Sequence, residues 1–420
     1  MKKSIIFVIV LSMLLLTACG SSSGPSTGPS ASAPAASSGN APSDNAGGNS
    51  DKEPVVVGIV NDLSGNRSVS GTAITYGATL AAEEINAAGG VLGGRPIKLV
   101  VYDNKNDSTE TINAYTRVVD VDRASAVITS DASSICLSLI EISNQKKVPL
   151  LGMPSDPRAT MNQETGEPHP YMFLVTQPNA VQQAAIMAYY LKENTDLKRA
   201  AVFYDQGNAY TVVNSEAFIK IWRDELGMEI AAIETYNTND QDYKTQLTKI
   251  KNSGADFIYA PNTPAQLTMT IQQAVQIGLD LPYTGALDMA DPFLSNLPDP
   301  TVLTKALFQS VVWMKDEKLQ DFINNYKQRF NVDPQVKSIN GYDAMYVLYH
   351  AIEAAGSDDP EAIRNALEND IKDIQLLVSD HYTQDPKTHA PLNLGMVINS
   401  IDKGVLSYVC FYEIPESAKN

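Results

Sequence analysis

Apolar positions follow two alternating periods along residues 55–153. The run 55–60, VVVGIV, is continuously apolar, as expected for a strand that is buried on both faces. Between 74 and 85, apolar residues recur at every third or fourth position, which predicts an amphipathic helix. The alternation continues with strands expected at 97–101, 125–129 and 148–153 and helices at 112–119 and 135–142. Strands that alternate with helices predict parallel βαβ units.

A second block of the same kind begins after Pro178. Strands are expected at 199–204, 229–235, 256–260 and 281–285, and helices at 213–226, 243–251 and 266–277. The chain after about residue 308 is mainly helical in pattern, and it ends in two strands around the turn SIDKG. Two α/β blocks of similar size predict an α/β fold with two doubly wound lobes.

The first residues have the pattern of a secretory leader. Lys2 and Lys3 precede the apolar run 5–16, which is shorter than the about twenty residues that span a membrane. We therefore expect residues 1–18 to be a signal peptide. The stretch 16–19, LTAC, resembles the bacterial lipobox, in which cleavage before the cysteine is followed by attachment of diacylglycerol to its sulfur. This predicts lipidation of Cys19, with an ordinary signal peptide and a chance cysteine as the alternative.

Residues 19–53 are rich in Gly, Ser, Ala, Pro and Asn and contain no aromatic residue. Such a segment cannot bury enough apolar surface to offset its chain entropy, so we expect a flexible tether behind the lipidated Cys19. A folded body from about residue 54 would then lie outside the cytoplasmic membrane, held by the lipid anchor. The pattern leaves open a Gram-positive or a Gram-negative host.

Composition excludes several function classes. The net charge of −17 argues against nucleic acid as a partner, because such binding needs a basic surface. Cys136 and Cys410 lie in apolar sequence and are expected to be two buried thiols, with a disulfide between them as the alternative outside the cell. The four histidines lack metal-ligand spacing, and no nucleophile motif lies between a strand and a helix. We therefore expect no enzyme activity, no metal and no cofactor.

Residues 76–107 carry a resemblance to a known protein family. Residues 76–107, YGATLAAEEINAAGGVLGGRPIKLVVYDNKND, resemble the periplasmic-binding proteins of branched-chain amino acid transport. Further matches follow in the order of the family, at LSG (63–65), at VPLLGMPS (148–155) and from 340 onward. The glycines at 89–94 follow a helix and precede a strand, whereas a dinucleotide-binding motif follows a strand and opens a helix. We therefore do not expect these glycines to bind a phosphate group.

The resemblance implies a type 1 periplasmic-binding fold, in which two lobes joined by three crossovers close on a ligand like a hinge. It assigns 54–177 and 310–375 to lobe 1, and 178–309 and 376–415 to lobe 2. It also implies a monomeric substrate-binding lipoprotein that captures a small molecule, an amino acid of the branched-chain or a similar kind. The implied partners are the permease subunits of an ABC importer.

Ligands of parallel α/β sheets bind beyond the carboxyl ends of the strands, which selects the loops after each strand. In lobe 1, Ser133 and Ser134 lie at an expected helix start, where backbone N–H groups and hydroxyls favour an anion. The family uses a serine here for the ligand's α-carboxylate, whereas a plain N-cap is the alternative. Ser155 and Asp156 follow the next strand. The resemblance makes Ser155 a ligand contact, and Asp156 would either bind an ammonium group or cap a turn.

In lobe 2, the loop 205–210 resembles the family's D-x-x-x-Y-G loop, although it is one residue longer and has Thr211 in place of the glycine. The resemblance implies that Tyr210 contacts the ligand, that Asn262 lies beside it and that Asp288 pairs with the ligand's ammonium group. Arg67 would either meet a second acidic group of a ligand or face solvent.

Two further functions remain open. A protein of this fold can act as a ligand sensor or receptor, or it can bind amides, urea-like solutes or aromatic acids. An exported hydrolase belongs to another class and is disfavoured because no nucleophile–base pair stands out in the sequence.

Overall fold

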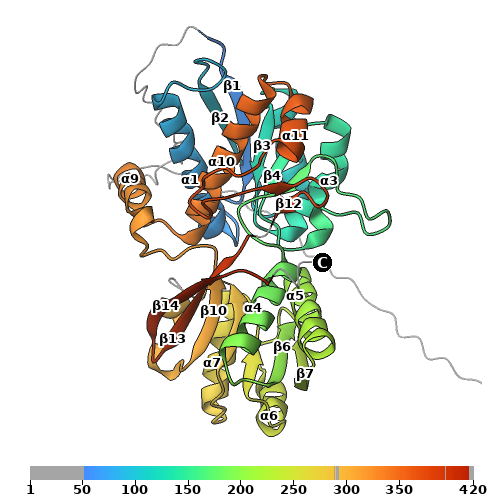
Figure 1. Cartoon of the computed structure of the whole chain (residues 1–420), viewed down its shortest axis with the longest axis vertical. Coiled ribbons are helices and arrows are strands. Elements are labelled where there is room, and N and C mark those ends of the chain that lie inside the picture. Colours follow the sequence, from blue (N-terminus) through green and yellow to red (C-terminus); the bar gives the residue numbers. More distant parts are fainter. Residues whose placement is uncertain (1–51, 288, 290–292, 393, 416–420) are drawn as a thin grey trace, which may run out of the picture. The chain divides into compact units, whose positions relative to one another are not determined.

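The computed structural model describes residues 52–287, 289, 293–392 and 394–415 (Figure 1). The leader, Cys19, the tether as far as residue 51 and Asp288 lie outside the described residues. Within the described part of the chain, no helix has both the length and the apolar character needed to cross a membrane.

The first sheet is parallel and has the strand order β2-β1-β3-β4-β5. The expected strands and helices of the first block are confirmed, whereas β5 was not expected. The strands are β1 (Val55–Asn61), β2 (Ile97–Asp103), β3 (Ala126–Thr129), β4 (Leu150–Gly152) and β5 (Met172–Leu174), and the helices are α1 (Ser68–Ala87), α2 (Ser108–Asp120) and α3 (Ser133–Lys146). A short 3-10 helix, Pro157–Ala159, follows β4.

Helix α10 (Val336–Ala355) packs against α1, although the two lie far apart in the sequence (Figure 1). A Cβ atom on Gly77 would lie 1.9 Å from the carbonyl oxygen of Ser338, and one on Gly341 would lie 2.0 Å from that of Ile74. The two glycines thus allow the helix backbones to touch. Two more helices belong to this region, α9 (Gln320–Phe330), which contacts α1, and α11 (Pro360–Asn369), which contacts α10.

The second sheet has the order β14-β13-β10-β9-β8-β6-β7, in which β6 to β10 are parallel and β13 and β14 form an antiparallel hairpin. The expected helix at 213–226 begins earlier, and its last part is a π-helix, Lys220–Glu225. The strands are β6 (Arg199–Asp205), β7 (Glu229–Tyr236), β8 (Phe257–Tyr259), β9 (Tyr283–Leu287), β10 (Ala306–Ser310), β13 (Met396–Asp402) and β14 (Val405–Tyr412). The helices are α4 (Ala180–Asn194), α5 (Ala209–Ile219), α6 (Lys244–Asn252), α7 (Pro264–Gln276) and α8 (Phe293–Asn296), and two 3-10 helices span Pro300–Val302 and Glu317–Leu319.

The chain passes between the two sheets three times, after β5, after β10 and before β13. The third passage comes later than the expected position at 376. The backbone N–H groups of Leu377 and Val378 donate to the carboxylate of Asp343 in α10, and the side-chain amide of Gln384 donates to the carbonyl oxygen of Leu174 in β5. The two-residue strands β11 (Gln384–Asp385) and β12 (Ala390–Pro391) belong to this segment, and β12 contacts β5. These contacts keep residues 376–391 with the first sheet, which corrects the expected boundary.

Strand β10 was also unexpected, since the pattern after residue 308 indicated helix. Its last two residues, Gln309 and Ser310, are polar but buried, and the Gln309 amide donates to the carbonyl oxygen of Gln183. Cys136 is buried, Cys410 is half-buried, and both are free thiols. The disulfide alternative is therefore not what the structure contains.

Candidate functional site

Each sheet has one point where the connections leave neighbouring parallel strands in opposite directions. In the first sheet this point lies between β1 and β3, because β2 and β4 lie on the outer sides of that pair. In the second sheet it lies between β6 and β8, with β7 and β9 outside them. Crevices at such switch points are the usual ligand sites of α/β sheets. Arg67 and Asn262 lie in the loops after β1 and β8, and Ser133 and Tyr210 lie in the first turns of the helices that follow β3 and β6.

The two serines occupy the first turn of α3, as expected. The N-cap residue is Ala132, which makes no side-chain cap, so the N-cap alternative does not apply to either serine. The Ser133 hydroxyl instead accepts a hydrogen bond from the backbone N–H of Asp156 at 3.1 Å, and Ser134 is exposed. Because the first N–H groups of a helix lack partners within the helix, this turn offers donors to an anion.

A cluster of charges lies beside α3. The carboxylate of Asp131, whose side chain is 6% exposed, accepts from Nη2 of Arg67 at 2.8 Å and from the Ser70 hydroxyl at 2.8 Å. The ammonium group of Lys337, at the start of α10, lies 3.8 Å from the same oxygen. Burial alone would raise the pKa of Asp131, but the two cations outweigh burial and hold that pKa at about 2. Arg67 therefore does more than face solvent.

Asp131 and Lys337 were not predicted. An acidic residue directly after β3 is a local signal that could have drawn attention to Asp131. No such signal exists for Lys337, which comes from a helix far along the chain. Its ammonium group also donates to the side-chain oxygen of Gln177 at 3.0 Å, so the cluster reaches the segment that leads into α4.

Asp156 caps the 3-10 helix that follows it. Its fully buried carboxylate accepts from the backbone N–H of Arg158 and pairs with the Arg158 guanidinium at 2.6 Å. Of the two alternatives for Asp156, the structure shows the cap, and both oxygens of its carboxylate accept from Arg158. The neighbouring Ser155 is buried, and its hydroxyl accepts from the side-chain amides of Gln177 at 3.3 Å and Gln183 at 3.5 Å.

On the second sheet, Tyr210 is the second residue of α5 and its hydroxyl donates to Oε1 of Gln183 at 3.1 Å. The buried Asn262 donates from Nδ2 to the carbonyl oxygen of Phe203 at 3.2 Å. The structure thus connects Ser155 and Tyr210 through one side chain, Gln183 of α4, which sequence reasoning missed because no family motif covers that helix.

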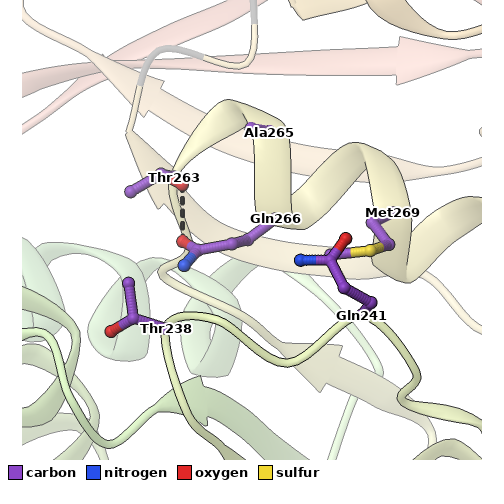
Figure 2. A pocket seen from close by; sticks show the side chains of 6 residues that line it. All are labelled: Thr238, Gln241, Thr263, Ala265, Gln266 and Met269. Atoms are coloured by element: carbon purple, nitrogen blue, oxygen red, sulfur yellow. Dashed lines mark hydrogen bonds between the residues drawn. The ribbon is translucent and has the colours of Figure 1, made fainter. Parts of the chain in front are cut away.

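Asp205 ends β6 and is fully buried. Its carboxylate accepts from the backbone N–H of Gly207, the Thr238 hydroxyl and the Gln266 amide, at 2.8, 3.1 and 2.9 Å. A cavity of about 400 Å³ lies beside it, where Gln266 also accepts from Thr263 (Figure 2). The cavity is lined by Thr238, Gln241, Thr263, Ala265, Gln266 and Met269, which are uncharged and differ from the predicted site residues. In the described ranges, His, Cys, Asp and Glu side chains form no group of three or more that could hold a metal ion.

The family model described as "Periplasmic binding protein" matches residues 54–404. The leucine-, isoleucine-, valine-, threonine-, and alanine-binding protein of Pseudomonas aeruginosa is 24% identical over 316 residues, which are 75% of this chain and 82% of that protein. The chain is also similar to the structure of a branched-chain amino acid transporter substrate binding protein from Streptococcus pneumoniae in complex with isoleucine. The TM-score is 0.74 at 23% identity, with 86% of this chain and 100% of that chain covered.

A solute binding protein of an ABC transporter from Rhodopseudomonas palustris, solved in complex with 3,4-dihydroxy benzoic acid, has a TM-score of 0.70 at 17% identity. The likeness covers 87% of this chain and 99% of that chain. Both structural likenesses show the fold, two α/β lobes with parallel sheets and helices.

Proposed function

The chain belongs to the periplasmic binding protein family, and on that premise we propose that it captures an amino acid, branched-chain or similar, outside the cytoplasmic membrane and delivers it to an ABC importer. The relative from Pseudomonas aeruginosa, whose name gives leucine, isoleucine and valine as ligands, and the Streptococcus pneumoniae protein solved with isoleucine support this ligand class. The ligand would lie between the two lobes, which would close on it about the three passages.

The observation that carries the proposal is the position of the predicted residues at the two switch points. Ser133 and Ser134 start α3 beside β1 and β3, while Tyr210 and Asn262 follow β6 and β8. We propose that the ligand's carboxylate binds the first turn of α3 and that the second lobe contacts the rest of the ligand. Ser155 joins the site through Gln183, whose side chain also accepts from Tyr210.

The ligand's ammonium group needs a carboxylate or several acceptors if it is buried. Asp131, Asp156 and Asp205 are each held by two or more donors of the protein. Asp288, which follows β9 and lies outside the described residues, therefore remains our proposal for the ammonium partner.

The hydrogen bonds that already occupy these three carboxylates favour one alternative ligand class. A simple organic acid needs the donors of α3 but no carboxylate partner, and the relative from Rhodopseudomonas palustris was solved with an aromatic acid. An aromatic or other carboxylic acid is therefore the second candidate ligand. In both cases we propose that the protein is a lipoprotein held to the membrane through Cys19.

A thermal-shift screen of amino acids, their amides and aromatic acids tests the proposal. A ligand at 100 times its dissociation constant should add about 2.7 kcal/mol to the free energy of unfolding. Small-angle scattering of the same samples should show a smaller radius of gyration with the ligand that gives a shift. Amino acids and aromatic acids that leave both quantities unchanged at millimolar concentration would contradict the proposed function.

A further inference from the structure

We propose that Arg67 is a ligand-binding residue whose guanidinium joins the first turn of α3 in binding the ligand's carboxylate, so that the site selects acids over the corresponding amides. The inference rests on the proposed function and adds a residue and a selection rule to it. It applies equally to an amino acid and to an aromatic acid, which share the carboxylate.

The position of Arg67 is the first support. Arg67 directly precedes α1 in the loop after β1, and its partner Asp131 lies two residues before α3 in the loop after β3. The 2.8 Å contact between Nη2 of Arg67 and Oδ2 of Asp131 therefore spans the switch point of the first sheet. A guanidinium held there lies beside the segment that leads into the first turn of α3.

Arg67 is held at both ends. The backbone N–H of Arg67 donates to the buried carboxylate of Asp62 at 2.7 Å. The same carboxylate also accepts from the backbone N–H groups of Ser64 and Gly65. Its side chain is held by Asp131, which Ser70 fixes in turn. A charge that is already ordered loses little conformational entropy when a ligand binds, so it contributes more of its interaction energy to affinity.

The guanidinium still has donors to offer. The side chain of Arg67 is 38% exposed although it is paired with Asp131, so the ion pair does not seal it from solvent. A guanidinium carries five N–H donors in a planar fork that matches a carboxylate. Nε of Arg67 is buried and, among the residues that the structure describes, has no hydrogen-bond partner. Lobe closure around a carboxylate would supply acceptors to this group.

The guanidinium of Arg67 favours an anion over a neutral group. A ligand carboxylate would accept charge-assisted hydrogen bonds from this cation, in addition to the bond that Arg67 donates to Asp131. An amide carries no negative charge, so the same contact with an amide oxygen gains less electrostatic energy. The predicted selection of acids over amides follows from this difference.

The experiment measures dissociation constants by calorimetry for two pairs of probes, L-isoleucine with L-isoleucinamide and benzoate with benzamide. The parent protein should bind one of the acids, and the pair that binds identifies the source of the carboxylate. Arg67→Gln should weaken binding of that acid about 10- to 100-fold and change binding of its amide far less. Arg329→Gln is the matched control, because Arg329 also pairs with a carboxylate, that of Glu83, but on the outer surface of α1 and α9. It should leave both dissociation constants unchanged.

Removing Arg67 alone takes one cation away from the buried carboxylate of Asp131, which can lower the free energy of unfolding. The double variant Arg67→Gln/Asp131→Asn removes both charges and separates the two effects. If Arg67 binds the carboxylate, the double variant keeps the weak binding of Arg67→Gln. If affinity for the acid returns in the double variant, the loss came from the unpaired Asp131 and the inference is wrong.

The remaining outcomes distinguish the inference from the proposed function. An Arg67→Gln protein that binds the acid as tightly as the parent overturns the inference alone. A parent protein that binds an amide more tightly than its acid also overturns the inference and leaves solute capture standing. If the parent binds none of the four probes and no other acid of the thermal-shift panel, the inference and the proposed ligand class both fail.

Discussion

The hydroxyl of Tyr210 donates a hydrogen bond to the side chain of Gln183, with the two oxygen atoms 3.1 Å apart. The amide nitrogen of the same Gln183 lies 3.5 Å from the Ser155 hydroxyl and donates to the carbonyl oxygen of Pro178 at 2.8 Å. Ser155 follows β4 of the first sheet, and Tyr210 follows β6 of the second. One side chain on α4 therefore links the segments that follow two strands of different sheets.

Tyr210→Phe should lower the free energy of unfolding by about 1 kcal/mol, because it removes the hydrogen bond between the Tyr210 hydroxyl and Gln183. Gln183→Ala should cost more, since it removes several bonds. In urea unfolding, the double variant should cost less than the sum of the single variants, which reveals the coupling. Tyr408→Phe is the control, because Tyr408 is an exposed tyrosine of the edge strand β14, and it should change stability by less than about 0.5 kcal/mol. Strict additivity of Tyr210→Phe and Gln183→Ala would contradict the bond.

Gly77→Ala should destabilise the first lobe by about 1–3 kcal/mol or more, because the new methyl group meets the backbone of α10 at Ser338 and the helices must separate. Gly341→Ala should act in the same direction through Ile74. Thermal unfolding measures both. Val69→Ala, at an exposed position of the same helix α1, should have little effect. A Gly77→Ala protein as stable as the parent would show that α1 and α10 do not touch as described.

Burial raises the pKa of Asp343 to about 7, although the N–H groups of Leu377 and Val378 oppose the shift. This pKa lies above the value of about 3.9 in an unfolded chain, so the folded state binds the proton more tightly. The resulting stabilisation is complete below about pH 4 and is lost as the pH rises through about 7. Between pH 5 and 8 the parent should lose stability that an Asp343→Asn variant does not lose. Identical pH profiles of the two proteins would rule out the buried carboxyl as the cause.

Asp131 should show the opposite pH dependence. Its pKa of about 2 lies below the unfolded value, so its contribution is present above about pH 4 and is lost as the pH falls toward 2. Asp131→Asn should therefore flatten the acid limb of the stability profile and leave the change between pH 5 and 8 in place. A variant that instead alters the neutral range would contradict this assignment.

Asp288→Ala should weaken binding of an amino acid by about 2–5 kcal/mol if this carboxylate pairs with the ligand's ammonium group, because the ammonium is then buried without a partner. Ser134→Ala should cost less, about 1–2 kcal/mol, since the backbone donors of α3 remain. Titration calorimetry measures both. Unchanged affinity in Asp288→Ala would mean that the ligand is an acid without an ammonium group or that another residue binds the ammonium.

Cys19→Ser should release the protein from the membrane, because the thiol that would carry the lipid is gone. Cell fractionation and labelling with a radioactive fatty acid measure this. Cys136→Ser is the matched control and should stay in the membrane fraction with its label. Label on the Cys19→Ser protein would place the lipid elsewhere.

The sequence by itself determined the alternation of strands and helices, the start of α3 at Ser133 and the family. These features are local, since a strand and a helix differ in the period of their apolar residues over a few turns of chain. The family motif at 83–94 is likewise a continuous stretch. The expected strand at 55–60 and helix at 135–142 therefore needed no knowledge of distant residues.

Only the tertiary structure decided which distant side chains complete the two sheet edges. Lys337 meets Asp131 because α10 packs on α1, and Gln183 meets Ser155 because α4 follows the first passage between the sheets. Strands β5 and β10 were missed, and Asp343 holds residues 377 and 378 with the first lobe against the expected boundary. Such contacts depend on long-range packing and on the hydrogen bonds of buried polar groups, which leave no periodic trace in the sequence.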